Sequence, residues 1–87
     1  MTFAFQIVGM ARYFFDSRDA DGLMRDEEGL ELNSLQAVKL AATRGLGDWA
    51  KDAIPGATKG DLTIDVRDDS GNQVFSAALS FTTLPEH

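Results

Sequence analysis

The chain has 87 residues, of which 44% are hydrophobic and 25% are charged, a balance typical of one folded domain and not of a disordered segment. It contains no cysteine, which excludes a disulfide framework, a thiolate metal site and a cysteine nucleophile. Its net charge is −6, and a negative field repels nucleic-acid backbones while it attracts cations and basic protein surfaces. We therefore expect no nucleic-acid partner.

The first nine residues alternate like a strand, with Phe3, Phe5 and Ile7 on one face. They lack the basic start of a signal peptide, and no stretch has the eighteen or more apolar residues of a spanning helix. We expect a cytoplasmic protein with no membrane partner. Residues 1–9 are interpreted as an N-terminal extension that is either ordered or a flexible leader. An ordered extension would continue the first strand backwards or add as an extra strand to a sheet edge of this or a neighbouring subunit. Residues 10–87 are interpreted as a single small domain.

Residues 12–18 predict the first strand of the domain, because aromatic and polar side chains alternate along it. Tyr13 and Phe15 point to one face, and Phe14 points to the other. The sequence D-A-D-G at residues 19–22 favours a tight turn, and residues 23–26 follow as a short return strand. This part of the chain predicts a β-hairpin.

The segment from Asp16 to Glu31 carries most of the net charge. It holds seven acidic and two basic residues, so we expect the hairpin to have an acidic tip. Glu27, Glu28 and Gly29 bend the chain, and a brief extended piece follows at residues 30–32.

A calcium-binding loop can be laid over residues 17–28. Asp19 and Asp21 then take positions three and five, and Gly22 and Glu28 take positions six and twelve. Ser17 at position one supplies no carboxylate, and the segment before it predicts a strand where an EF-hand needs a helix. We expect an acidic hairpin tip in solvent and no metal site.

The segment from Asn33 to Ile54 predicts the one helix. Asn33 is placed to cap it with Gln36 as the capping-box partner, and Pro55 and Gly56 end it. Gly45 and Gly47 each weaken a helix interior by about 1 kcal/mol, which indicates either close packing against the sheet or a mild kink, or else a break into two shorter helices. The apolar side chains recur at spacings of three and four on one face: Leu35, Val38, Ala42, Leu46, Trp49 and Ala53.

Two further strands are predicted after the helix. Residues 61–67 and 73–83 alternate between apolar and polar side chains, and the turn sequence D-S-G-N at residues 69–72 joins them as a hairpin. The expected fold is α+β, an antiparallel four-stranded sheet with one helix on one face, in the order β-β-α-β-β. The predicted core combines both layers: Phe15, Leu35, Val38, Leu46, Trp49, Ile64, Val66, Phe75, Leu79 and Phe81.

From Met10 onward the sequence M-A-R-Y-F-F, followed by R-D-E-E-G-L-E-L at residues 25–32, resembles a family of short alphaproteobacterial proteins that carries only a domain-of-unknown-function label. The resemblance implies a bacterial protein, and it implies no activity, cofactor or catalytic residue. Family members typically begin where Met10 stands, so residues 1–9 are expected to be an addition.

The sequence offers no set of residues for catalysis. The acidic residues lie in turns without apolar surroundings that would shift their pKa values, and the one histidine, His87, is the last residue. We expect no enzyme, no catalytic residue and no cofactor. Arg25 is expected to join the hairpin to the start of the helix through paired hydrogen bonds.

The function expected from the sequence is a non-catalytic protein-interaction module, either as a homodimer or with a basic protein partner. The alternative is a regulatory domain that binds a small molecule or a cation at the acidic hairpin of residues 16–31. The expected interaction surface includes an aromatic residue on the uncovered sheet face and the charged residues near it: Phe14, Arg12, Arg25, Asp26, Glu27 and Glu28.

Overall fold

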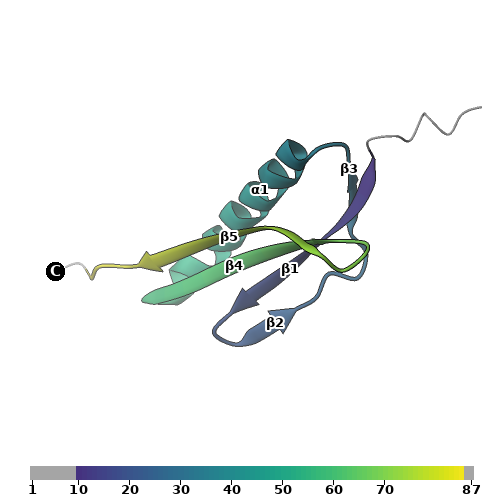
Figure 1. Cartoon of the computed structure of the whole chain (residues 1–87). Helices are drawn as coiled ribbons and strands as arrows, with labels where there is room; N and C mark the ends of the chain where they lie inside the picture. The colour runs from purple at the N-terminus through teal and green to yellow at the C-terminus, as the bar shows by residue number, and fades with distance from the viewer. Residues whose placement is uncertain (1–9, 86–87) are drawn as a thin grey trace, which may run out of the picture.

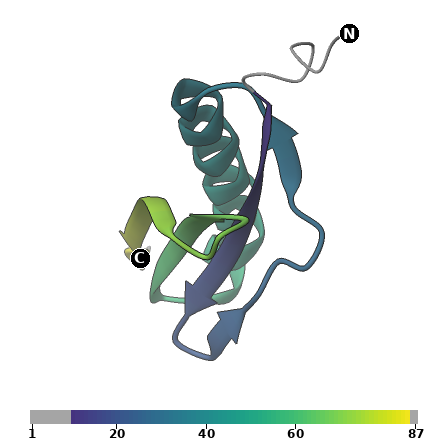
Figure 2. The ribbon, with the colours of Figure 1, turned by 45° about the vertical axis from the view of Figure 1, so that its right-hand side comes forward.

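The computed structural model describes residues 10–85, so the interpretations of residues 1–9 lie outside the described part of the chain. An antiparallel sheet carries one helix across one face, which confirms the α+β class (Figures 1 and 2). The strands are β1 (Ala11–Asp19), β2 (Gly22–Met24), β3 (Leu30–Leu32), β4 (Lys59–Asp68) and β5 (Gln73–Thr82). Helix α1 (Leu35–Ala53) and a short 3-10 turn η2 (Ile54–Gly56) stand between β3 and β4.

The sheet order is β2-β1-β4-β5, and β3 also pairs with β1. The extended piece at residues 30–32 is therefore a fifth strand, which the expected order β-β-α-β-β lacked. The return strand is also shorter than expected, because it covers Gly22–Met24 and ends before Asp26. Asp26 is withdrawn from strand pairing because its side chain binds backbone groups instead.

Helix α1 is continuous through both glycines, so the alternative of two shorter helices is wrong. A methyl group on Gly45 would lie 3.4 Å from Ile64 of β4, whereas one on Gly47 would meet nothing within 4 Å. Gly45 therefore lies against the sheet, where a methyl group would make an ordinary van der Waals contact, and Gly47 does not. The helix is capped by Ser34, whose hydroxyl accepts a hydrogen bond from the Ala37 N–H at 3.0 Å. The cap lies one residue later than the expected Asn33, because Ser34 is the residue with an extended backbone beside the first helical turn.

The core lies between α1 and the middle of the sheet. Its buried side chains come from one helix face and from β4: Val38, Ala42, Leu46, Ala50, Leu62, Ile64 and Val66. Leu35 was expected in the core but is 48% exposed, because the first helical turn extends beyond the apolar stripe that reaches the sheet. Three predicted core residues of β5, Phe75, Leu79 and Phe81, are only half-buried against the cluster. The core side chains of β4 are therefore buried, whereas those of β5 remain partly exposed to solvent.

Candidate functional site

The sheet face opposite the helix carries paired charges. Along β1, Tyr13 and Phe15 pack toward the core, so alternation places Phe14, Asp16 and Arg18 on the other face. Arg18 pairs with Asp65 of β4, with its Nε 2.7 Å from the carboxylate Oδ2. This face is therefore a network of ion pairs and not an apolar surface.

Asp16 is the one charged residue that is buried within residues 10–85. Its carboxylate accepts hydrogen bonds from Arg67 Nε at 2.8 Å and Arg67 Nη2 at 3.4 Å. The Arg67 guanidinium also lies 4.5 Å from the centre of the Phe14 ring, a distance at which a cation is attracted to the ring face. Arg67 therefore joins β4 to β1 through a paired charge and covers Phe14, which the sequence interpretation had left as an open contact residue.

A loop of five residues interrupts the edge strand beside β1. Ser17 lies opposite Met24, and Tyr13 lies opposite Leu30, so the three residues of β1 between these pairs face residues 25–29. The edge therefore carries two extra residues, which form a bulge between β2 and β3. Backbone groups of β1 at this bulge need other partners.

Asp26 supplies those partners. Its Oδ2 accepts a hydrogen bond from the Phe15 N–H at 3.0 Å, and its Oδ1 accepts from the N–H groups of Glu28 and Gly29 at 3.0 and 3.2 Å. The Asp26 N–H donates to Asp16 Oδ1 at 2.9 Å. The Asp26 side chain thus closes the bulge, and the Asp26 backbone N–H binds the bulge to the buried carboxylate of Asp16.

Both carboxylates are held in the ionised form. Burial of Asp16 acts to raise its pKa, but the hydrogen bonds from Arg67 and from the Asp26 N–H, with the nearby positive charges, lower that pKa below its ordinary value of 3.8. Burial also acts to raise the pKa of Asp26, and the three backbone N–H groups bound to its carboxylate outweigh it, so this pKa is lowered as well. These carboxylates stabilise the fold as anions.

The residues of the expected interaction surface separate into two groups. Arg12 donates to the Glu28 carbonyl at 2.6 Å and pairs with Glu31 at 3.1 Å, so it joins β1 to the bulge. Arg25 is exposed, and no hydrogen bond or ion pair links its side chain to another residue between 10 and 85. The contact expected between Arg25 and the start of the helix is therefore not seen within residues 10–85. The buried ion pair is made by Arg67, which lies directly opposite Phe14 in the β1–β4 register and joins β4 to β1 through Asp16.

The acidic tip is a tight turn between β1 and β2. The Asp19 carboxylate accepts a hydrogen bond from the Asp21 N–H at 2.8 Å, and strands stand on both sides where a calcium loop has helices. Within the part of the chain that the structure describes, no three histidine, cysteine or acidic side chains gather closely enough to hold a metal ion.

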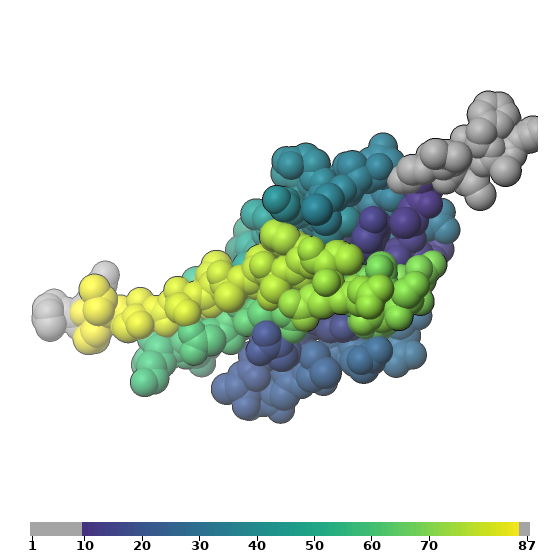
Figure 3. All heavy atoms as spheres, in the orientation of Figure 1, coloured from purple at the N-terminus to yellow at the C-terminus, as the bar shows by residue number. Residues whose placement is uncertain are grey.

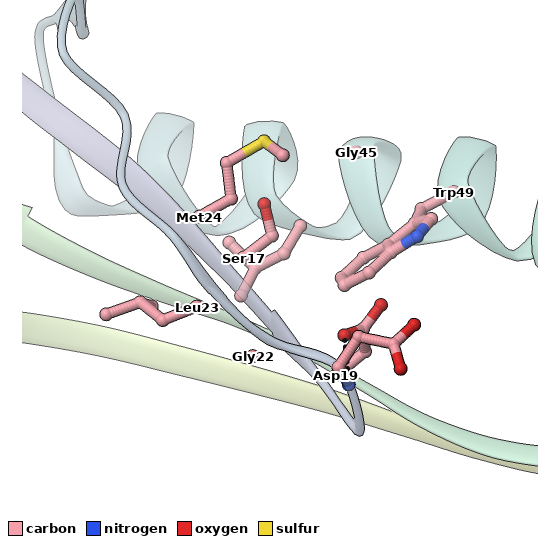
Figure 4. Close-up of a pocket in the computed structure, with 9 residues that line it drawn as sticks. Ser17, Asp19, Gly22, Leu23, Met24, Gly45 and Trp49 are labelled. Carbon is pink, nitrogen blue, oxygen red and sulfur yellow. Dashed lines mark hydrogen bonds between the residues drawn. The ribbon is translucent and has the colours of Figure 1, made fainter.

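A groove of about 450 Å³ lies between this hairpin and the second half of α1. Its apolar lining includes Trp49, Met24 and Ile64, and its polar rim includes Asp19 and Asp21. Figure 4 shows the Trp49 ring extending from the helix toward the hairpin, with Asp19 beneath it. Met24 is 72% exposed, so an apolar surface beside carboxylates is open to solvent here.

The other edge of the sheet is formed by β5. It pairs with β4 on one side, and no other strand within residues 10–85 pairs with its second side. Figure 3 shows β5 running along the surface of the molecule, with no other described segment in front of it. All ten of its residues are uncharged. Natural sheets usually protect an edge with a lysine, a proline or a bulge, and β5 has one register shift, at its start beside Phe75.

The sequence interpretation did not identify the buried pair, the bulge or the free edge. Alternation places Asp16 and Arg67 on the same sheet face. The strand register that brings them together depends on contacts between residues that are 51 positions apart in the sequence. The uncharged composition of residues 73–82 is visible in the sequence. Its meaning appears only when β5 is found at the end of the sheet order.

Residues 12–80 match the family described as a domain of unknown function (DUF6894). Since the match covers most of the 87 residues, the chain belongs to this family. No curated protein and no solved structure shows significant similarity to the chain. Neither helix within residues 10–85 combines the length and the apolar character that are needed to cross a membrane.

Proposed function

We propose that this chain is a non-catalytic protein-interaction module and that a partner strand adds to the free edge of β5. The observation that carries the proposal is the ten-residue uncharged strand at the end of the sheet. An unpaired edge presents backbone N–H and C=O groups in register for another strand, and binding by strand addition uses those groups for affinity. The half-buried Phe75, Leu79 and Phe81 would gain apolar contacts at the same time.

The charged groups support a structural role rather than a catalytic one. A general acid needs a pKa raised toward the working pH, whereas the pKa values of Asp16, Asp26 and Asp65 are all lowered. Burial of Asp16 and Asp26 opposes the lowering, while for Asp65 the hydrogen bond from Arg18 is the main cause of it. The carboxylates of Asp16 and Asp65 therefore act by pairing with arginines across β1 and β4, and that of Asp26 acts by closing the bulge.

The test is affinity capture from a native lysate, identification of the bound protein, and a binding titration with that protein after purification. Ala78→Lys places a charge in the middle of the β5 edge, and we expect at least a tenfold loss of affinity. Asp52→Lys changes an exposed charge on α1 by a larger amount, and as a control it should leave binding unchanged. Equal affinity of the wild type and the Ala78→Lys variant would contradict the proposal.

A second candidate function is supported by the groove beside the acidic hairpin. Its Trp49 ring and the carboxylates of Asp19 and Asp21 are the groups that attract an organic cation. Trp49 is the one tryptophan of the chain, so its fluorescence reports on the groove. Titration with tetramethylammonium chloride should give a saturable change that Asp19→Asn weakens, and sodium chloride is the ionic-strength control. An identical response to both salts would reject this candidate.

A further inference from the structure

We propose that the strand added to β5 is β5 of a second copy, so that two chains form one continuous antiparallel sheet about a two-fold axis at Ala78. This inference rests on the proposed function, because it names the partner that the free edge takes. Three features of the described strand support it: the direction of its free backbone groups, the match of its side chains with themselves, and the distribution of charge around it.

The register of β4 and β5 determines which backbone groups of β5 point outward. The Thr83 N–H donates to the Thr58 carbonyl at 2.7 Å, one step beyond the pair Lys59 and Thr82. Hydrogen-bonded and non-hydrogen-bonded pairs alternate in an antiparallel ladder, so Phe81 and every second residue before it bond to β4. The residues between them present their N–H and C=O groups to the free edge: Ser76, Ala78, Ser80 and Thr82.

A two-fold axis at Ala78 pairs these outward residues with each other. Ala78 then lies opposite its own copy, and Ser76 lies opposite Ser80 of the second chain. On the helix face, Phe75 comes opposite Phe81 of the second chain, and cross-strand aromatic pairs are favourable. Ala77 comes opposite Leu79, so a small side chain faces a larger one. This arrangement uses the whole regular stretch of β5 from Phe75 onward.

The charges also permit the pairing, although each chain has a net charge of −6. The carboxylates nearest to the edge on the open face belong to β4, where Asp65 and Asp61 accept hydrogen bonds from Ser76 and Ser80. Across the proposed interface these carboxylates are separated by three strand spacings, roughly 14 Å. That separation exceeds the Debye length of about 8 Å at physiological ionic strength. The acidic hairpin lies at the opposite end of the strand order.

The register can be tested by single cysteine substitutions, because the chain has no cysteine of its own. Ala78→Cys brings two thiols opposite each other at a Cα separation of about 5.5 Å, within the range of a disulfide. Oxidation of the full chain should therefore give a covalent dimer. Ser80→Cys lies on the same face two residues away, and its two copies would stand roughly 14 Å apart. That variant is the matched control and should stay uncrosslinked.

Light scattering on the full chain gives a second, independent measurement. We expect twice the 9.5 kDa of one chain for the wild type, and the mass of one chain for Ala78→Lys with an unchanged circular dichroism spectrum. A monomeric full-length wild type overturns the inference, even if a chain without residues 1–9 forms a dimer. Crosslinking of Ser80→Cys as fast as Ala78→Cys overturns the register. A monomer that still binds a different protein through β5 would refute the second copy and leave the proposed function standing.

Discussion

The carboxylate of Asp26 takes the place of a strand partner for Phe15, because its Oδ2 accepts the hydrogen bond of the Phe15 N–H at 3.0 Å. The interruption between β2 and β3 would otherwise leave this part-buried N–H unpaired. The Asp26 side chain therefore completes the backbone hydrogen bonding of β1. The neighbouring Glu27 carboxylate has no such role within residues 10–85.

Replacement of Asp26 by alanine should therefore destabilise the fold. Three backbone N–H groups lose their acceptor, and we expect the free energy of unfolding to fall by about 2–4 kcal/mol. Glu27→Ala removes the adjacent exposed carboxylate and should change that free energy by less than about 0.5 kcal/mol. Urea denaturation of both variants measures the difference. Equal effects would mean that the Asp26 hydrogen bonds do not contribute.

Two arginines on the open sheet face provide a matched comparison of burial. The side chains of Arg67 and Asp16 are 19% and 9% exposed, whereas those of Arg18 and Asp65 are 52% and 17% exposed. Both arginines place two nitrogens on their carboxylate, a geometry that lysine does not reproduce.

We expect Arg67→Lys to lower the free energy of unfolding by about 1–3 kcal/mol, because the pair is buried and the contact with the Phe14 ring is lost. Arg18→Lys should cost less than about 1 kcal/mol, because solvent screens the exposed pair. Denaturant titration at one pH distinguishes the two variants. A larger loss for Arg18→Lys would reverse the assigned roles.

Stability should decrease in acid. The pKa values of Asp16 and Asp26 are lower in the folded chain than their ordinary value of 3.8, so the unfolded chain binds protons first as the pH falls. The stabilisation is complete above about pH 5 and is lost as the pH falls through 4 toward the folded pKa values. Denaturation at pH 7, 4 and 3 should give a decreasing free energy of unfolding, with a smaller decrease for Asp16→Asn. A value that is constant from pH 7 to pH 3 would contradict this expectation.

Gly29 should tolerate no side chain. Its φ is +74°, and a methyl group would lie 2.8 Å from the Tyr13 carbonyl oxygen. Gly71 has a φ of +89° with nothing within 4 Å of the same position, so Gly71→Ala measures the backbone strain alone. We expect that strain to cost about 1–2 kcal/mol, and Gly29→Ala to cost clearly more. Similar melting temperatures for the two variants would show that the bulge moves away from β1 without penalty.

The α+β class, the helix and the last hairpin could be predicted from the sequence because each depends on local patterns. The spacing of Val38, Ala42 and Leu46 indicates a helix face, and the turn at residues 69–72 joins two alternating strands. Small shifts, such as the cap at Ser34 instead of Asn33, reflect a choice between adjacent residues that can both cap a helix.

The tertiary structure decided the features that depend on strand order and register. The sequence predicted Asp26 as part of an interaction surface and Arg25 as the residue that joins the hairpin to the helix. The fold instead uses Asp26 to close a bulge and Arg67 to pair with Asp16. These contacts join residues up to 51 positions apart, and no local spacing specifies which strands become neighbours. The uncharged composition of β5 can be seen in the sequence alone. Its position at a free edge depends on the order of the strands in the sheet, which no local pattern specifies.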